Sequence, residues 1–177
     1  MRWLVILLLM VSPAAADGTH DLAHLRADLA TGESATNILT RWCGDLHLAS
    51  PPVIKAVRSD ADKPATADIR RLLQAAPDEA IRYRKVALTC GTTVLSEADN
   101  WYRPGQLTAE MNRQLDNSDT SFGTVVRPLN FTRATLDVRE HPDAHAVLEV
   151  RALLTRAGGA PFSLVVEDYQ APLVADR

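Results

Sequence analysis

The stretch RKVALTCGTTVLSEADNWYRP, residues 84–104, decides the fold of this chain. Apolar and more polar residues alternate over Arg82–Cys90, which predicts a strand because successive side chains of a strand point to opposite faces. Gly91 marks a turn, and Thr93–Ala98 is predicted to return as the partner strand of a hairpin. The segment Asp99–Tyr102 is then predicted to form a turn around a packed tryptophan, with a flap as the alternative. The sheet therefore starts from an antiparallel pair.

Outward from this hairpin, helical and strand patterns follow in order. Leucines at helical spacing and Ser or Thr caps predict helices, and apolar runs bounded by Gly or Pro predict strands. The predicted helices are His20–Ala30 and those capped by Ser34, Thr66 and Thr108, and the predicted strands are Val53–Arg58, Val147–Leu154 and Phe162–Tyr169. Helices first and mostly antiparallel strands later favour a single α+β domain, in which helices pack on an antiparallel sheet.

The N-terminus has the three parts of a secretory signal peptide. Arg2 supplies a positive charge, residues 3–11 are an unbroken apolar run, and small residues follow. We expect a signal peptide over residues 1–16 and the domain over residues 17–177. The apolar run is shorter than the roughly 20 residues of a membrane-spanning helix, although an uncleaved anchor is the alternative. We therefore expect an exported protein, periplasmic or secreted, without stable membrane insertion after cleavage.

Composition narrows the range of partners and cofactors. The net charge is −3 and no basic stripe stands out, so nucleic acid is not expected as a partner. Export would favour a disulfide between Cys43 and Cys90, and the alternative, which the sequence leaves equally open, is a pair of buried thiols. Two cysteines without clustered histidines do not make a zinc site. We expect no metal, no cofactor and a monomer.

Arg84 is the first candidate for a binding residue. On the predicted strand it shares a face with the apolar residues Val86 and Leu88. A guanidinium on an apolar face must be paired, and its planar fork matches a carboxylate. Arg84 is therefore expected to contact an anionic ligand. The alternative is an internal salt bridge with Glu97 or Glu167.

Two further positions are candidates for the same site. Phe122 and Gly123 are expected to open a helix whose free amides attract anions, unless Gly123 is an ordinary loop glycine. Glu167 lies at the end of an apolar strand, where burial would raise its pKa. It could then act as a proton donor, or it could accept a hydrogen bond from a ligand hydroxyl. The alternative is a strand-end carboxylate in water. Arg133 is expected to stabilise the fold rather than to contact a ligand.

Together these motifs resemble the chorismate lyase family, whose fold is shared with the ligand-binding domains of some transcription regulators. The family has a strand with an Arg, apolar residues and a Cys, then a Pro-Leu-Gly turn with a downstream Thr-Arg, then a strand from a Pro to a Glu. The matching segments here are Arg84–Cys90, Ser121–Gly123, Thr132 with Arg133, and Pro161–Glu167. Their order and approximate spacing agree over residues 35–172.

The resemblance implies a buried site for 4-hydroxybenzoate between an antiparallel sheet and helical flaps. Arg84 and the backbone amide of Phe122, beside Gly123, would hold the carboxylate, and Glu167 would contact the hydroxyl. The implied activity is elimination of pyruvate from chorismate or a related enol ether, with Arg84 and Glu167 as the catalytic residues. The implied partner is a small-molecule aromatic carboxylate.

This sequence departs from the family in ways that bear on function. A signal peptide would separate the protein from the cytoplasm, where chorismate is made, and Ser121-Phe122 replaces the family's Pro-Leu with a larger ring. Three hypotheses stay open because a fold does not determine a function. The first is a lyase, toward which the resemblance leans. The second is an exported binding protein for a small aromatic or organic acid. The third is a structural domain with a filled core.

Overall fold

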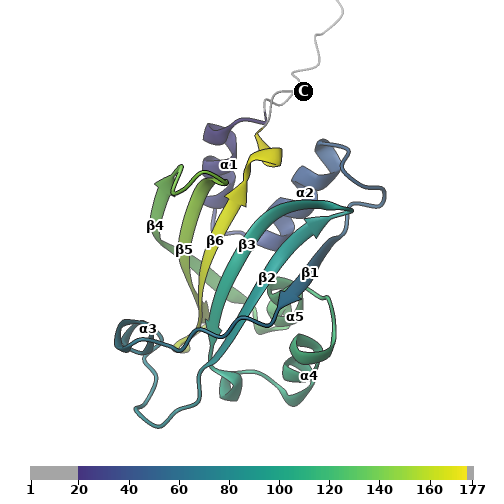
Figure 1. Cartoon of the computed structure of the whole chain (residues 1–177). Helices are drawn as coiled ribbons and strands as arrows, with labels where there is room; N and C mark the ends of the chain where they lie inside the picture. Colours follow the sequence, from purple (N-terminus) through teal and green to yellow (C-terminus); the bar gives the residue numbers. More distant parts are fainter. Residues whose placement is uncertain (1–19, 175–177) are drawn as a thin grey trace, which may run out of the picture.

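The computed structural model describes residues 20–174, and the predicted signal peptide lies outside them. Its centre is an antiparallel sheet of six strands in the order β1-β2-β3-β6-β5-β4 (Figure 1). The strands are β1 (Ile54–Ser59), β2 (Arg82–Cys90), β3 (Thr93–Tyr102), β4 (Phe131–Glu140), β5 (Ala146–Arg156) and β6 (Pro161–Gln170). The predicted α+β fold with a mostly antiparallel sheet is confirmed.

Helices pack on both faces of this sheet. They are α1 (Leu22–Leu29), α2 (Ala35–Asp45), α3 (Ala67–Leu72), α4 (Ala109–Asn117) and α5 (Phe122–Val126). Helices α1 and α2 bury their apolar sides in one large core with β2, β3 and β5, and α5 packs beside them with α4 (Figure 1). Helix α3 packs on the opposite face, where Ile69 and Leu73 contact Trp101 and Leu164. In this arrangement, the inward face of β2 and β3 lies beneath α2 and α5.

The predicted caps explain where three of the helices begin. The side-chain oxygens of Ser34, Thr66 and Thr108 each accept a hydrogen bond from the backbone N–H three residues later, at 3.1–3.3 Å. Such a cap satisfies one of the free donors at a helix start. The helices therefore start where the sequence places a cap.

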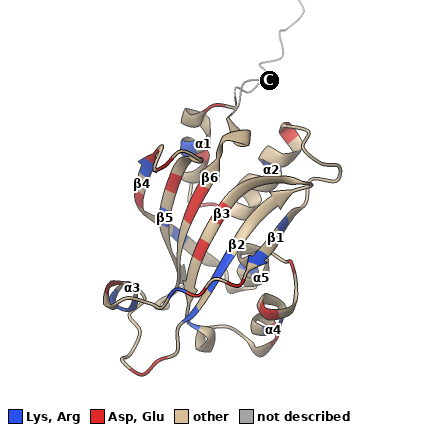
Figure 2. Cartoon of the chain, viewed as in Figure 1, with Lys and Arg blue, Asp and Glu red and all other residues tan. Residues whose placement is uncertain are grey.

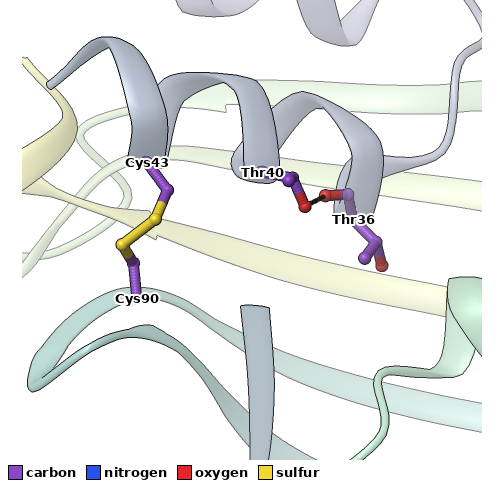
Figure 3. The surroundings of a disulfide bond; sticks show 4 residues. All are labelled: Thr36, Thr40, Cys43 and Cys90. Carbon is purple, nitrogen blue, oxygen red and sulfur yellow. Dashed lines mark hydrogen bonds between the residues drawn. A yellow bond between two sulfur atoms is a disulfide. The ribbon is translucent and has the colours of Figure 1, made fainter. Parts of the chain in front are cut away.

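A disulfide links the first core helix to the hairpin. Cys43 of α2 and Cys90 at the end of β2 are bonded, with their Cα atoms 6.0 Å apart (Figure 3). One turn earlier on α2, the Thr40 hydroxyl donates to the carbonyl of Thr36 at 2.8 Å. Of the two states that the sequence left open for the cysteines, the structure shows the disulfide. It holds α2 over the strand that carries Arg84.

One prediction about the strands is wrong, and one strand was missed. Asp99–Tyr102 is neither a turn nor a flap, because β3 continues through it and pairs with both β2 and β6. Within the sheet, Asp99 accepts a hydrogen bond from the Tyr83 hydroxyl at 2.5 Å. Strand β4 was not predicted. Its residues are mostly exposed, so it lacks the apolar alternation that identifies a half-buried strand.

Candidate functional site

A cavity lies between the inward face of the sheet and the beginnings of α2 and α5. All four predicted site residues line it, namely Arg84, Phe122, Gly123 and Glu167. Most of the remaining lining is apolar, and the cavity volume is about 40 Å³. The structure therefore brings together residues that are up to 83 positions apart in the chain, from 84 to 167. Their roles in binding or catalysis stay predictions.

Arg84 enters this cavity from β2 and has no charged partner among the described residues. It is 4% exposed, and its Nη2 donates to the carbonyl of Thr120 at 3.3 Å. The Nε atom is buried and has no acceptor among residues 20–174. Burial, followed by the nearby positive charge of Arg58, lowers the pKa of Arg84 to about 10. The guanidinium is held where an anion would relieve both its charge and its unpaired donor.

The internal salt bridge that was the alternative for Arg84 is wrong. Glu97 lies on the other face of the sheet and pairs with Lys85, with 3.4 Å between Nζ and Oε2. Glu167 pairs with Arg133 instead. Within the described chain, Arg84 takes part in no ion pair. The acids that could have neutralised it are therefore engaged elsewhere.

The opposite side of the cavity holds a buried ion pair. Nη2 of Arg133 donates to Oε2 of Glu167 at 2.6 Å, and the Tyr169 hydroxyl donates to the same oxygen at 3.0 Å. The two charged side chains are 2% and 8% exposed. Arg133 also donates to the carbonyl of Leu29 at 3.1 Å, which ties β4 to α1. These contacts support the expectation that Arg133 stabilises the fold, although it lines the cavity as well.

Glu167 is not a strand-end carboxylate in water, because it is 6% exposed. Both of its donors bind Oε2, so the side chain is engaged as an acceptor. No donor is assigned to Oε1 anywhere in residues 20–174. The arrangement suits the acceptance of a ligand hydroxyl better than the donation of a proton.

Phe122 and Gly123 begin α5, as the sequence predicted, but the helix is five residues long. So short a helix has little of the dipole that an anion site needs. Gly123 serves close packing instead, since a Cβ there would lie 2.8 Å from Oγ1 of Thr36. Phe122 stacks near Phe162, with ring centroids 6.3 Å apart, and forms an apolar wall of the cavity.

Asn100 is the cavity residue that the sequence reasoning missed. It lies directly opposite Arg84 in the β2–β3 pair and is 4% exposed. The Ser163 hydroxyl donates to its Oδ1 at 2.6 Å, whereas its Nδ2 has no acceptor in the part of the chain that the structure describes. Extending the strand past Ala98 would have revealed it, because Asn100 is in phase with the inward residues.

Residues 20–174 were also compared with the requirements of a metal site and of a membrane-spanning helix. No group of three or more His, Cys, Asp or Glu side chains is arranged to hold a metal ion there. None of the helices described is both long enough and apolar enough to cross a membrane.

Comparison with known proteins identifies relatives by sequence and by fold. No family model matches the chain. The uncharacterised protein y4mC of Sinorhizobium fredii (strain NBRC 101917 / NGR234) is 44% identical over 173 residues, covering 84% of this chain and 73% of y4mC.

The solved structures are more distant. The effector domain of PhnF from Mycobacterium smegmatis has a TM-score of 0.52 and 10% identity, covering 66% of this chain and 80% of that one. A GntR-family regulator from Enterococcus faecalis V583 gives 0.50 and 14%, covering 70% and 97%. The possible transcriptional regulator YydK from Bacillus subtilis has a TM-score of 0.51 and 15% identity. The matched region covers 70% of this chain and 60% of YydK. At these identities the likeness shows the fold alone, which is the GntR effector and chorismate lyase-like fold.

Proposed function

We propose that this chain, which belongs to the same family as protein y4mC of Sinorhizobium fredii, binds a small organic acid whose carboxylate pairs with Arg84. The observation that carries the proposal is the buried guanidinium in the cavity without a carboxylate partner in residues 20–174. A carboxylate accepting from the fork of Arg84 forms charge-assisted bonds, each worth about 1.5–3 kcal/mol.

The lining suggests the rest of the ligand. Phe122 and Phe131 contribute aromatic rings to the cavity wall, which suits a flat apolar body. At about 40 Å³ the cavity is smaller than the roughly 150 Å³ that holds benzene in a dry apolar cavity. A single-ring acid such as 4-hydroxybenzoate would therefore need the lining to move apart.

Binding has more support than turnover. A lyase that eliminates pyruvate from chorismate needs a group that moves a proton at the ring or the ether oxygen. Glu167 is the nearest candidate, and its Oε2 is already engaged by Arg133 and Tyr169. A binding protein needs an unsatisfied cation and a shaped cavity, and both are present in the described chain. Incubation with chorismate should accordingly release no pyruvate.

Export is part of the proposal. The disulfide between Cys43 and Cys90 is of the kind that persists in oxidising compartments. The charged and apolar start of the chain matches a signal peptide ending at Ala16. N-terminal sequencing of the protein recovered from the producing cell should begin at Asp17. Recovery of the full-length chain from the cytoplasm would contradict export.

Calorimetric titration with 4-hydroxybenzoate tests the binding site. Arg84→Ala should weaken binding about tenfold to a hundredfold, since each 1.4 kcal/mol is a factor of ten. Arg84→Lys should restore it in part, because an ammonium is a point charge and not a fork. Arg82→Ala is the matched control, since Arg82 lies on the same strand, pairs with Asp116 at 3.0 Å and is not among the cavity residues.

The possible outcomes separate clearly. Equal affinity of the wild type and Arg84→Ala would remove Arg84 from the site. No binding by the wild type of 4-hydroxybenzoate, benzoate or any other single-ring acid would overturn the proposed function.

A further inference from the structure

We infer that Asn100 is a second ligand-binding residue, and that together with Arg84 it selects acids that carry an oxygen on the carbon next to the carboxylate. The inference rests on the proposed binding of an acid at Arg84. It adds a chemical class to that proposal, the 2-oxo and 2-hydroxy acids. Four observations on the same part of the sheet support it.

The first observation is the register of the hairpin. Arg84 and Asn100 are directly opposite each other in the antiparallel β2–β3 pair, and both line the cavity. Residues in such positions have Cβ atoms about 4.5–5.5 Å apart. Their donor groups therefore reach the head group of one small molecule.

The second observation is where the unsatisfied donors lie. Residues 20–174 contain four buried side-chain nitrogen or oxygen atoms without a hydrogen-bond partner, on Arg84, Asn100, Asn112 and Arg151. The first two are nitrogen donors in this cavity, and the last two belong to residues outside its lining. A buried unsatisfied donor costs about 1–3 kcal/mol, so two at one place point to a ligand that satisfies both.

The third observation is how the amide of Asn100 is held. The fully buried Ser163 hydroxyl donates to Oδ1 at 2.6 Å, and this bond is the one assigned to Ser163 Oγ in the described structure. It fixes the orientation of the amide and leaves Nδ2 as the free end. The side chain is therefore preorganised as a donor before any ligand arrives.

The fourth observation is the number of oxygens that these donors require. The fork of Arg84 matches the two oxygens of a carboxylate. The Nδ2 donor of Asn100 then calls for a third oxygen close by, and an oxo or hydroxyl group on the adjacent carbon supplies it. An acid without that oxygen leaves Nδ2 buried and unpaired. Sites built around such a bond reject the analogue that lacks it.

A matched pair of acids tests the inference. Phenylglyoxylate and phenylacetate differ by a carbonyl in place of a methylene beside the carboxylate. Calorimetric titration of the wild type should show at least a tenfold preference for phenylglyoxylate, which corresponds to about 1.4 kcal/mol. Asn100→Leu has a similar volume and no donor, and it should reduce the preference to less than about threefold while retaining phenylacetate binding.

Two further variants keep the test sharp. Asn112→Leu is the control, because Asn112 also has an unpartnered buried atom but lies on α4 outside the cavity lining. It should retain the full preference. If Asn100→Leu fails to fold, Ser163→Ala takes its place in the test. This variant keeps Asn100 but removes the hydrogen bond that orients its amide, so it should lower the preference for phenylglyoxylate. Thermal denaturation of each variant establishes that it is folded.

The outcomes distinguish this inference from the proposed function. Equal affinity of the wild type for both acids, an unchanged preference in Asn100→Leu, or an equal loss of both acids in that variant would overturn the selection by Asn100. Each of these results leaves Arg84 as an acid-binding residue. Failure of the wild type to bind either acid, together with failure to bind 4-hydroxybenzoate, would overturn the proposed function itself.

Discussion

The β2 side and the β4 side of the cavity each contribute one buried arginine, and the two differ in the partners that the fold provides for them. Arg133 on β4 has a carboxylate, a backbone carbonyl and a neighbouring tyrosine hydroxyl that shares the same acid. Arg84 on β2 has one long bond to a carbonyl and an unpaired Nε in the described chain. Burial is therefore common to both arginines, and the presence or absence of an internal partner is what differs between them. We propose ligand binding only for the arginine without an internal carboxylate in residues 20–174.

Strand order explains the difference. Residue 133 is opposite residue 154 on β5, and β5 in turn pairs with β6, so the acid on β6 is within reach of the long arginine side chain. The neighbour of Arg84 on β3 is the neutral Asn100. The charge on its other side is Arg58, which adds repulsion. Within residues 20–174, no carboxylate forms an ion pair with Arg84 on the β2 side.

The largest loss of stability is expected when Arg133, the paired arginine, is replaced. Arg133→Met leaves Glu167 buried without its cation, and the free energy of unfolding should fall by about 3–5 kcal/mol. Urea denaturation measures the loss. The double variant Arg133→Met with Glu167→Leu should recover most of it, because no unpaired charge remains. A loss below about 1 kcal/mol in the single variant would mean that the ion pair does not stabilise the fold.

The disulfide tests how firmly the β2 side is held. Replacing both Cys43 and Cys90 by Ser removes a cross-link between residues 47 positions apart, and the free energy of unfolding should fall by about 2–4 kcal/mol. Reducing agent should destabilise the wild type by a similar amount and leave the double variant unchanged. Equal stability of the oxidised wild type and the variant would show that the bond constrains neither the folded nor the unfolded chain.

The unpaired arginine should respond in the opposite direction. Arg84→Met removes a buried charge that has no internal acid in residues 20–174, so the free energy of unfolding should be unchanged or rise by about 1 kcal/mol. The same urea titration gives the value. A loss comparable to that of Arg133→Met would show that Arg84 is structural, and the contrast between the two sides would disappear.

A smaller change in the free energy of unfolding is expected from Asp168, which follows Glu167 on β6 and faces the other side of the sheet. It lies opposite Glu97 and Glu149 on the two neighbouring strands, within the acidic positions along β3, β5 and β6 (Figure 2). Partial burial, followed by these like charges, raises the pKa of Asp168 from 3.8 to about 6. The folded chain therefore binds more protons than the unfolded chain between those pH values.

The sign of the pH dependence follows from that difference. The destabilising contribution of Asp168 is fully present above about pH 6 and is lost as the pH falls toward 3.8. Asp168→Asn should raise the free energy of unfolding by a few tenths of a kcal/mol at pH 7, allowing for solvent screening, and by less at pH 4. Urea titrations at both pH values measure it. A gain that is larger at pH 4 would contradict burial and like-charge repulsion as the cause of the raised pKa.

The sequence predicted the parts of this site that depend on local pattern. Alternation along β2 was enough to place Arg84 inward, whereas the apolar run around Glu167 left both a buried acid and a strand-end carboxylate in water open. The partners of these residues could not be predicted, because pairing between Arg133 and Glu167 depends on β4 and β6 flanking β5. Strand β4 itself carries no apolar alternation. Asn100 was missed because its polar neighbours were interpreted as the end of the strand.

The missing side chain at Gly123 has a consequence for engineering. Because a Cβ there would come within 2.8 Å of the Thr36 hydroxyl, this glycine sets the spacing between α5 and α2. A methyl or hydroxymethyl group at this position would press against Thr36 and push the beginnings of α5 and α2 apart. Position 123 is thus a point at which the distance between α2 and α5, and with it the volume of the cavity that both helices line, can be changed by a single substitution.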